Sequence, residues 1–462
     1  MDLVFRPERY PFLTQDLPGV GGEIRVEPED FQVEEVPAYL PKGEGEHLYF
    51  LLEKEGRTTR EVLEFLRDEV GVPEKEIGVA GLKDKRAKTR QWFSIPRKYE
   101  DALCLLENLQ GVRLLAADLH TNKLRTGHLK GNRFHILIRR PKGGVAEAEA
   151  VLKRLAEKGV PTYYGPQRFG LGGLNPVRGY KLVKEGKGRG SPWLKRFLIG
   201  SLQSLLFNDW VALRMALGLY DRVVLGDWAK KHATGGEFLV EDPGEAERAL
   251  RLEISATGPL FGKKYPEAQG EARAIEDEVL ARYGLKREEF RARRGARRPI
   301  RVPLAEWKVE EAPEGLWLSF FLPKGSYATS LLREVLKVEA LDHLEADPAP
   351  ADAEGLQPGL PPFPVLGEAG EEEVEEAGKL PEDQKTRLGP LLLPKLLHPP
   401  AGHAVGHPEE VPGPVVGLGG GVGVFGVAVG GVLVGEDPPA GQGAVGVDPA
   451  EPRLQEGAGA SA

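Results

Sequence analysis

Short apolar runs bounded by polar residues recur through the first 155 residues of the chain. Runs of this kind, when they contain aromatic and β-branched residues, are typical of strands. A clear example is His47-Leu-Tyr-Phe-Leu-Leu-Glu53, in which apolar side chains fill the centre. The pattern predicts strands at residues 31–36, 47–53, 91–95 and 133–139.

Apolar residues at helical spacing mark two segments of the same region. Thr58 and Thr59 precede the amphipathic run 60–67, and a threonine hydroxyl can cap a helix by accepting a hydrogen bond from its first turn. Residues 145–158 repeat apolar positions every three or four residues, and Gly159 follows them. We therefore predict a capped helix at each segment.

The pattern changes after about residue 155. An aromatic, glycine-rich loop opens a second region, which becomes helical from Pro192 through Leu217 and carries a long, basic, helix-like stretch near 270–294. A third region, 303–345, returns to a strand around Leu316-Trp-Leu-Ser-Phe-Phe-Leu322 and then a helix from Ala328 to Val338. Strands and helices thus recur in both regions.

The remainder, residues 346–462, differs in composition. Its only aromatic residues are Phe363 and Phe425, and glycine and proline dominate its end. Such a segment cannot offset the entropy of ordering by burying apolar surface. We expect a disordered, acidic tail.

Charge separates the tail from the rest of the chain. The whole chain has a net charge of −8, from 62 Lys+Arg and 70 Asp+Glu. The tail holds 5 basic and 18 acidic residues, a net of −13, so the first 345 residues carry 57 basic and 52 acidic residues, a net of +5. This mildly basic body is compatible with a polyanionic partner.

Other features of the composition bound the class of protein. The single cysteine, Cys104, excludes an internal disulfide, and its apolar neighbours favour a buried side chain. The first residues lack a basic segment followed by an apolar run, and no run of about 18 apolar residues exists. We expect a soluble, cytoplasmic protein.

The segment richest in candidate chemistry is Val79-Ala-Gly-Leu-Lys-Asp-Lys-Arg-Ala-Lys-Thr-Arg-Gln-Trp92. It places one carboxylate, Asp84, among five basic residues. Neighbouring positive charges favour the ionised carboxylate and keep it ready as a nucleophile or base. Taken alone, the segment also fits a solvated basic loop, or a helix cap formed by Asp84.

The segment closely resembles the signature of TruD-type tRNA pseudouridine synthases, in which the aspartate after Gly-x-Lys is catalytic. Six further groups of motifs follow the family's order. They are Arg25-Val-Glu-Pro-Glu-Asp-Phe31, Lys123-Leu-Arg-Thr-Gly-His-Leu-Lys-Gly-Asn-Arg-Phe134, Tyr163-Tyr-Gly-Pro-Gln-Arg-Phe-Gly170, Ser201-Leu-Gln-Ser-Leu-Leu-Phe-Asn208, Thr257-Gly-Pro-Leu-Phe-Gly262 with Arg297-Arg-Pro-Ile-Arg-Val302, and Leu322-Pro-Lys-Gly-Ser-Tyr-Ala-Thr329. The resemblance covers about residues 20–340.

The resemblance implies an α+β fold: the pseudouridine synthase catalytic core, a mixed and mostly antiparallel sheet with flanking helices, and an inserted α/β TRUD domain. The core would comprise residues 1–155 and a return segment, 303–345, around an insertion at 156–302, with the tail at 346–462. It also implies that tRNA is the substrate, with uridine 13 isomerised to pseudouridine. We expect a monomer that does not associate with a membrane.

This isomerisation breaks the C1′–N1 bond, turns the uracil and joins C5 to C1′. It involves no redox change and loses no group, so neither a metal nor an organic cofactor is required. A single ionised aspartate can attack C1′ or remove a proton from C2′, and the sequence leaves both routes open. The uridine must first leave its stack.

The resemblance also implies roles for residues around Asp84. Arg25 would form a salt bridge with the catalytic carboxylate, although a surface arginine before a strand is the alternative. Asn132 and Phe134 would line the uridine pocket; they could also be a turn asparagine and a core phenylalanine. Tyr327 stands where the family often has phenylalanine and would pack under the base. Lys83 could bind phosphate or serve the structure.

Two clusters of basic residues favour contacts with the RNA backbone. The first contains Lys123, Arg125, Lys130, Arg133, Arg139 and Arg140, and the second contains Arg291, Arg293, Arg294, Arg297, Arg298 and Arg301. As candidate backbone contacts we single out Lys123, Arg125, Arg133, Arg168, Arg294, Arg297 and Arg298.

Two other functions remain as alternatives. A tRNA-binding or RNA-chaperone module could keep the same fold without the chemistry, although the intact Gly-x-Lys-Asp segment argues against it. A metal-dependent nuclease would need clustered carboxylates, for which Glu29, Asp30, Glu34 and Glu35 are the nearest candidates.

Overall fold

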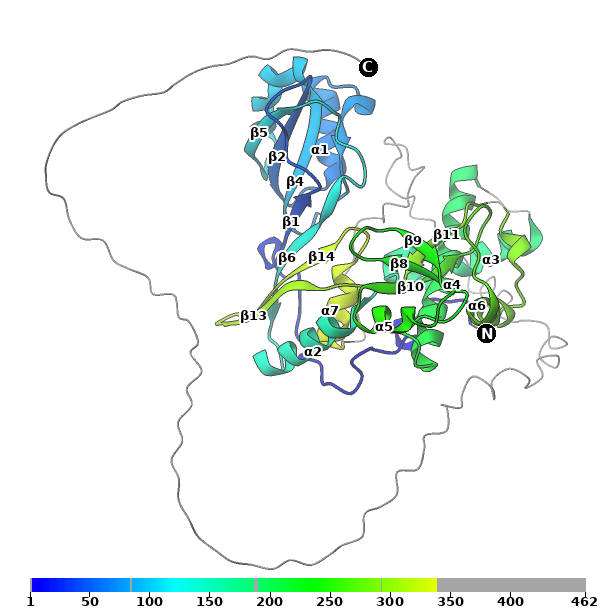
Figure 1. Ribbon diagram of the computed structural model, residues 1–462. Coiled ribbons are helices and arrows are strands. Elements are labelled where there is room, and N and C mark those ends of the chain that lie inside the picture. The colour runs from blue at the N-terminus through cyan, green and yellow to red at the C-terminus, as the bar shows by residue number, and fades with distance from the viewer. Residues whose placement is uncertain (1, 84, 187–189, 292, 339–462) are drawn as a thin grey trace, which may run out of the picture. The chain divides into compact units, whose positions relative to one another are not determined.

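The computed structural model describes residues 2–83, 85–186, 190–291 and 293–338 (Figure 1). Asp84 and the predicted tail lie outside the described residues.

The larger sheet has eight strands in the order β13-β14-β6-β1-β4-β2-β5, with β3 paired to β4 (Figure 1). Only β1 and β4 pair in parallel, and the other pairs are antiparallel. The strands are β1 (Phe31–Pro37), β2 (His47–Glu55), β3 (Gly78–Val79), β4 (Lys88–Pro96), β5 (Val112–His120), β6 (Leu129–Arg139), β13 (Ala305–Ala312) and β14 (Gly315–Pro323). Residues 305–323 thus join the sheet built by the first 139 residues.

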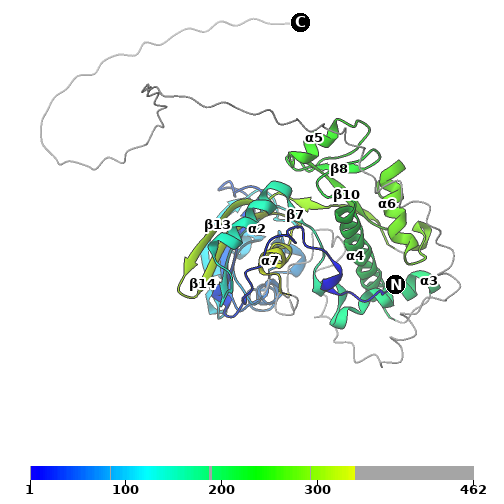
Figure 2. The ribbon, with the colours of Figure 1, turned by 90° about the horizontal axis from the view of Figure 1, so that it is seen from below.

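Two helices cover one face of this sheet beside β6 and β14. They are α2 (Val145–Lys158) and α7 (Ala328–Leu336), and Figure 2 shows them beside β13 and β14. Leu152 and Leu155 of α2 and Leu331 of α7 are fully buried in one apolar cluster with Ile136 of β6. In this cluster, residues near the start of the described chain, such as Val20, pack with residues near its end, such as Leu336.

A second apolar cluster supports the other half of the sheet. Alternate side chains of β2, Leu48, Phe50 and Leu52, pack against α1 (Thr59–Phe65) and the π-helical turn Leu66–Val70. Thr58 caps α1 by accepting a hydrogen bond from the Glu61 amide, and the Glu61 side chain accepts one from the Thr58 amide. The predicted cap of this helix is confirmed.

The segment between α2 and β13 forms a smaller antiparallel sheet with helices around it (Figure 2). The fully buried ring of Trp210 packs where a side chain at Gly258 would stand. A short pair, β7 with β12, joins the two ends of this segment. The elements are β7 (Val160–Pro161), α3 (Asn175–Glu185), α4 (Pro192–Ala216), β8 (Trp228–Lys231), β9 (Glu237–Leu239), α5 (Glu245–Leu250), β10 (Ile254–Leu260), α6 (Gly270–Ala281), β11 (Ala296–Pro299) and β12 (Arg301–Val302).

The predicted fold class, a mixed and mostly antiparallel sheet with flanking helices, is confirmed. The strands and helices predicted in the first 158 residues are present, with ends that differ by a few residues. Within the described residues, no helix combines the length and the apolar character needed to cross a membrane.

Two predictions were wrong. The helix-like stretch near 270–294 is α-helical only to Ala281, because the chain turns at Gly284, whose φ is +61°, and only a short 3₁₀ segment, Arg287–Phe290, follows. Cys104 is exposed rather than buried. It lies in the 3₁₀ segment Arg97–Asn108, where the three-residue repeat directs Leu103 and Leu106 inward and leaves the cysteine outside.

Candidate active site

The candidate catalytic residue, Asp84, lies outside the described residues, but the segments on both sides of it are described. Before it, the backbone of Lys83 exchanges hydrogen bonds with Thr59, the first residue of α1. The Lys83 amide donates to the Thr59 hydroxyl at 2.7 Å, and the Thr59 amide donates to the Lys83 carbonyl oxygen at 3.2 Å. The residue that precedes Asp84 is therefore held against a helix N-terminus.

Gln91, on β4, holds the same segment from the sheet. Its amide nitrogen donates to the carbonyl oxygen of Gly81 at 2.5 Å, and its amide oxygen accepts from the Thr59 hydroxyl at 2.9 Å. Thr59 and Gln91 are both buried. Gln91 is part of the family motif, whereas Thr59 was named only at the start of the predicted helix. The hydrogen bond between them could not be predicted from the sequence.

The side chain of Lys83 forms a buried ion pair. Its ammonium nitrogen is 3.2 Å from a carboxylate oxygen of Glu35 on β1, and the two side chains are 4% and 1% exposed. The other oxygen of Glu35 accepts from the Trp92 amide on β4 at 3.4 Å. Of the two roles considered for Lys83, this geometry favours the structural one, because a phosphate would have to replace a buried carboxylate.

Lys54 is a functional candidate that the sequence reasoning missed. It is fully buried, and its ammonium group donates to the carbonyl oxygens of Arg57 at 2.8 Å and Lys83 at 3.5 Å. The signal was present in the pattern, because Lys54 continues the buried alternation of Leu52 and Phe50 along β2. A lysine at such a position brings a positive charge into the interior, beside the segment that carries Asp84.

The pairing of strands β1 and β6 places the two predicted pocket residues of β6, Asn132 and Phe134, on one face of the sheet. Phe31, Val33 and Glu35 alternate on that face, and Val33 is paired with Phe134 and Glu35 with Asn132 across β6. The Asn132 side chain therefore projects from the strand position next to the Lys83–Glu35 pair. Its amide oxygen is buried and has no hydrogen-bond partner among the described residues.

The glycine before Asn132 is required by close packing of two strands. A side chain at Gly131 would meet the carbonyl oxygen of Leu322, on β14, at 2.1 Å. The Gly-Asn pair of the motif thus combines a close backbone approach with a side chain on the pocket face.

Arg25 and Phe134 both contact the ring of Phe31. The guanidinium carbon of Arg25 lies 4.1 Å from the centre of the Phe31 ring, and the Phe31 ring meets Phe134 edge to face at 6.3 Å. Arg25 is buried and has a φ of +55°, an uncommon backbone conformation for arginine. Its surroundings differ from those of the surface arginine considered as the alternative.

Phe134 is part of the core as well as of the candidate pocket. Its ring stacks on Phe320 of β14 at 5.1 Å, and only 7% of the residue is exposed. These contacts support the interpretation of Phe134 as a core phenylalanine, and its role in the uridine pocket stays a prediction.

Tyr327, which precedes α7, belongs to a cluster of aromatic rings around Arg298. The guanidinium carbon of Arg298 lies 4.3 Å from the ring centre of Tyr164 and 5.2 Å from that of Tyr327. Asn208 of α4 holds Tyr164 by exchanging two hydrogen bonds with its backbone, at 2.7 and 2.9 Å. Arg168 joins the cluster with its guanidinium 5.0 Å from the Tyr164 ring and bonds the Ser204 hydroxyl.

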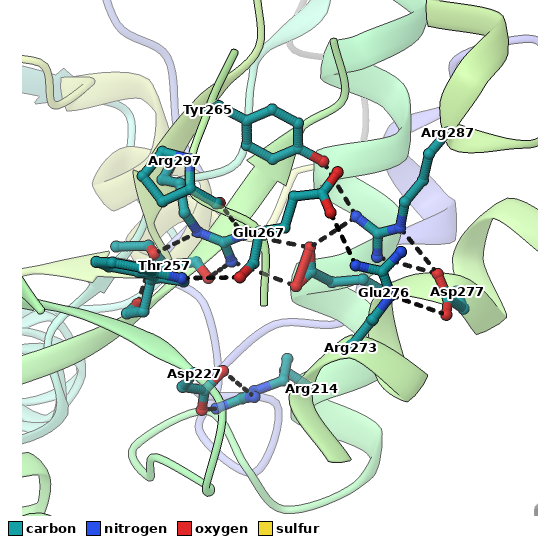
Figure 3. A network of polar contacts seen from close by, with 12 residues as sticks. Arg214, Asp227, Thr257, Tyr265, Glu267, Arg273, Glu276, Asp277, Arg287 and Arg297 are labelled. Atoms are coloured by element: carbon teal, nitrogen blue, oxygen red, sulfur yellow. Dashed lines mark hydrogen bonds and ion pairs between the residues drawn. The ribbon is translucent and has the colours of Figure 1, made fainter. Parts of the chain in front are cut away.

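The structure places two of the predicted RNA-backbone contacts in the interior. Arg298 donates to the Thr162 carbonyl oxygen at 3.1 Å, and 7% of it is exposed. The side chain of Arg297 is fully buried and donates to both carboxylate oxygens of Glu276 at 3.3 Å, where Arg287 also converges (Figure 3). Burial raises the pKa of Glu276, and the charge of Arg297 opposes that rise. We therefore do not include Arg297 or Arg298 among the proposed RNA contacts.

The other predicted backbone contacts lie nearer the surface. Arg294 is exposed, and Arg133 is half-exposed and donates to Glu306 at 2.8 Å. Lys123 and Arg125 line a cavity between β5 and β6. Arg168 is the exception, because it is partly buried beside Tyr164.

Two of the four acidic residues considered for a metal site, Asp30 and Glu35, pair with basic side chains instead. Asp30 binds the guanidinium group of Arg139 through both oxygens, at 2.6 and 2.8 Å, and Glu35 binds Lys83. Within the described ranges, no group of three or more His, Cys, Asp or Glu side chains is arranged to hold a metal ion.

Comparisons with known proteins agree with the motif order. A sequence model of the family described as tRNA pseudouridine synthase D (TruD) matches residues 10–186 and 189–335. The chain is 99% identical over 356 residues to the tRNA pseudouridine synthase D of one strain of Thermus thermophilus, which covers 77% of this chain and all of that protein. It is 44% identical over 348 residues to that of an Anaeromyxobacter species, covering 71% of this chain and 97% of the relative.

A solved structure is similar over the same extent. The crystal structure of the putative tRNA pseudouridine synthase D from Methanosarcina mazei matches with a TM-score of 0.58 and 25% identity, covering 71% of this chain and 96% of that chain.

Proposed function

The chain belongs to the tRNA pseudouridine synthase D family, and on that premise we propose that it isomerises uridine to pseudouridine in tRNA, at position 13. The observation that carries this proposal is the buried polar framework around residue 84. Thr59 and Gln91 hold the backbone of Gly81 and Lys83, and Lys54 adds a buried positive charge beside Lys83. A framework of this kind is expected where a side chain must be held in one position.

Asp84 is the proposed catalytic carboxylate, which attacks C1′ or removes the C2′ proton. The C1′–N1 bond breaks, the uracil turns, and its C5 bonds C1′, which releases Asp84 from C1′ or returns the proton to C2′. C5 then loses its proton and N1 gains one. Arg25 is the proposed ion-pair partner of Asp84, which it would orient and keep ionised. No redox change occurs and no group is lost, so the chemistry requires no metal or organic cofactor.

The uridine is proposed to enter at the face shared by Asn132 and Phe134, and Tyr327 is proposed to pack under the base. The buried, unpartnered amide oxygen of Asn132 supports this placement, because a uracil N3–H could satisfy it. Lys83 acts from behind the pocket, through its ion pair with Glu35. Arg133, Arg294, Lys123 and Arg125 remain the proposed contacts to the RNA backbone.

We also propose that residues 156–302 form an insertion into a core made of 1–155 and 303–345. The shared sheet of β1, β6 and β14 supports this division. We further propose that the protein is monomeric and acts in the cytoplasm.

The test is pseudouridine formation in tRNA by the wild-type protein and the Asp84→Ala variant, with EDTA present. We expect pseudouridine at position 13 with the wild type only. Activity of Asp84→Ala would contradict the mechanism. If the wild type bound tRNA but formed no pseudouridine, the RNA-chaperone function would replace this proposal.

A further inference from the structure

A cavity of about 410 Å³ lies at the start of β2 and along the loop between β5 and β6. It is lined by His47, Thr121, Asn122, Lys123, Arg125 and His128. These side chains carry hydrogen-bond donors, two of them are cationic, and no carboxylate belongs to the described lining. The composition suits an anionic ligand with several oxygen atoms.

The two cations of the cavity are incompletely neutralised. The side chain of Arg125 makes no hydrogen bond or ion pair with any residue that the structure describes, and Lys123 donates only to the carbonyl oxygen of Lys75. Burial, followed by repulsion from Arg125, lowers the pKa of Lys123. A bound anion would relieve both effects, because it would replace lost hydration and screen the repulsion.

His47 supplies a second indication of a ligand. Its Nδ1 atom is buried and has no hydrogen-bond partner among the described residues. His128 is held in place, since its Nδ1 lies 2.9 Å from the hydroxyl of Tyr39. One imidazole of the cavity is therefore oriented by the protein, and the other retains an unused polar atom.

The loop that forms the cavity is joined to the segment before Asp84. The Gly127 amide donates to the carbonyl oxygen of Ala80 at 2.8 Å, and the Leu124 amide donates to the Ser94 hydroxyl on β4 at 3.0 Å. Lys324, from the turn after β14, donates to the Gly127 carbonyl oxygen at 3.1 Å. A ligand in the cavity would thus contact a loop that is hydrogen-bonded to the segment before Asp84.

We propose that this cavity binds a phosphate group of the tRNA backbone, through Arg125 and Lys123. The proposal rests on the proposed function, since it assumes that tRNA is the substrate. Phosphate oxygens would accept from the guanidinium and ammonium groups, with Asn122 and Thr121 as further donors. The contact would position the strand that carries the target uridine, independently of base sequence.

The test measures tRNA binding against salt concentration for the wild type, Arg125→Met and Arg125→Met/Lys123→Met. Each lost phosphate contact should weaken binding and reduce the slope of log affinity against log salt by about one. Arg125→Lys should retain most of the slope, because it keeps the charge. Urea unfolding of each variant establishes that the fold is intact.

The matched control is Arg251→Met. Arg251 is also an exposed arginine, but Glu253 neutralises it at 2.9 Å. We expect an unchanged salt slope for this variant. Equal slopes for the wild type, Arg125→Met and the double variant would overturn the proposal.

Inorganic phosphate serves as the probe for a small-anion site. It should shift the NMR signals of the His47 and His128 rings in the wild type and not in the double variant. If it did so while the tRNA salt slope stayed unchanged, the cavity would bind small anions and the proposal would fail. The binding tests require no turnover, so they are independent of whether the wild type forms pseudouridine.

Discussion

The buried ammonium group of Lys54 lies 3.5 Å from the carbonyl oxygen of Lys83. Lys83 is the residue that precedes Asp84 in the chain. A lysine this deeply buried is uncommon, because an ammonium ion loses its hydration there. Its position suggests that its charge acts on the catalytic segment.

Lys54→Met should therefore lower the single-turnover rate of pseudouridine formation by about 100-fold, as loss of one preorganised electrostatic contact typically does. Methionine fills a similar volume without the charge, so tRNA affinity should change little. The rate and the affinity can be measured separately on the same preparation. An unchanged rate in a folded variant would show that Lys54 only supports the structure.

The Lys83–Glu35 pair predicts a large effect on stability. Glu35→Gln leaves the buried ammonium of Lys83 without its carboxylate, and should cost about 3–5 kcal/mol in the free energy of unfolding. Urea unfolding measures this cost. Adding Lys83→Met should recover part of it, because the unpaired charge is then removed.

Glu306→Gln is the control for that measurement. It breaks the exposed Arg133–Glu306 pair, whose side chains are 49% and 55% exposed, and should leave the free energy of unfolding nearly unchanged because solvent screens the pair. Similar costs for the two variants would show that burial of the Lys83–Glu35 pair is energetically unimportant.

Asp30 predicts part of the acid sensitivity of the fold. Burial raises the pKa of Asp30, but the hydrogen bonds from Arg139 and from the Glu27 amide, together with the charge of Arg139, outweigh burial and hold the pKa below its usual value of 3.8. Because the folded pKa is lowered, the stabilisation is present above the unfolded pKa and is lost as the pH falls through the folded pKa. Asp30→Asn should destabilise the protein at pH 7 and flatten the loss of stability below about pH 4.

Asp16→Asn is the matched control, since Asp16 also binds an arginine through both oxygens, at 3.0 Å to Arg154, but is exposed. Solvent screening should make its effect on unfolding small at both pH values. The prediction fails if the two variants show the same pH dependence.

Two glycines of the motifs should respond differently to alanine. A methyl group at Gly131 would meet the Leu322 carbonyl oxygen at 2.1 Å, whereas at Gly81 the nearest atom is the Lys83 ammonium at 3.6 Å. Gly131→Ala should destabilise the protein by about 1–3 kcal/mol or more, as overpacking does, and should also impair activity by displacing Asn132. Gly81→Ala should fold normally. Thermal unfolding of both variants distinguishes these outcomes, and equal stabilities would contradict the packing argument.

A chain ending at residue 345 should fold and modify tRNA. The family match ends at residue 335, and α7 ends at Leu336. Pseudouridine formation and thermal unfolding of this shortened protein should match those of the full chain. Loss of activity would assign a function to residues 346–462.

The local pattern by itself determined most elements of the first 158 residues, because helical spacing, strand-like runs and caps are properties of neighbouring residues. The cap of α1 by Thr58 and the full extent of α2 follow from such signals. The motif order also identified the family, since it is written along the chain. Cys104 was misplaced because the spacing did not reveal a 3₁₀ segment.

Only the tertiary structure decided which of those residues meet. The partners Thr59 and Gln91, Lys83 and Glu35, and Arg297 and Glu276 are separated by 21 to 48 residues, so no local pattern joins them. The register of β1 with β6 placed Asn132 beside Glu35, and burial turned Arg297 and Arg298 from candidate RNA contacts into interior ones. Strand pairing and desolvation depend on the whole fold, and for that reason the charge of a lysine or arginine did not reveal its role.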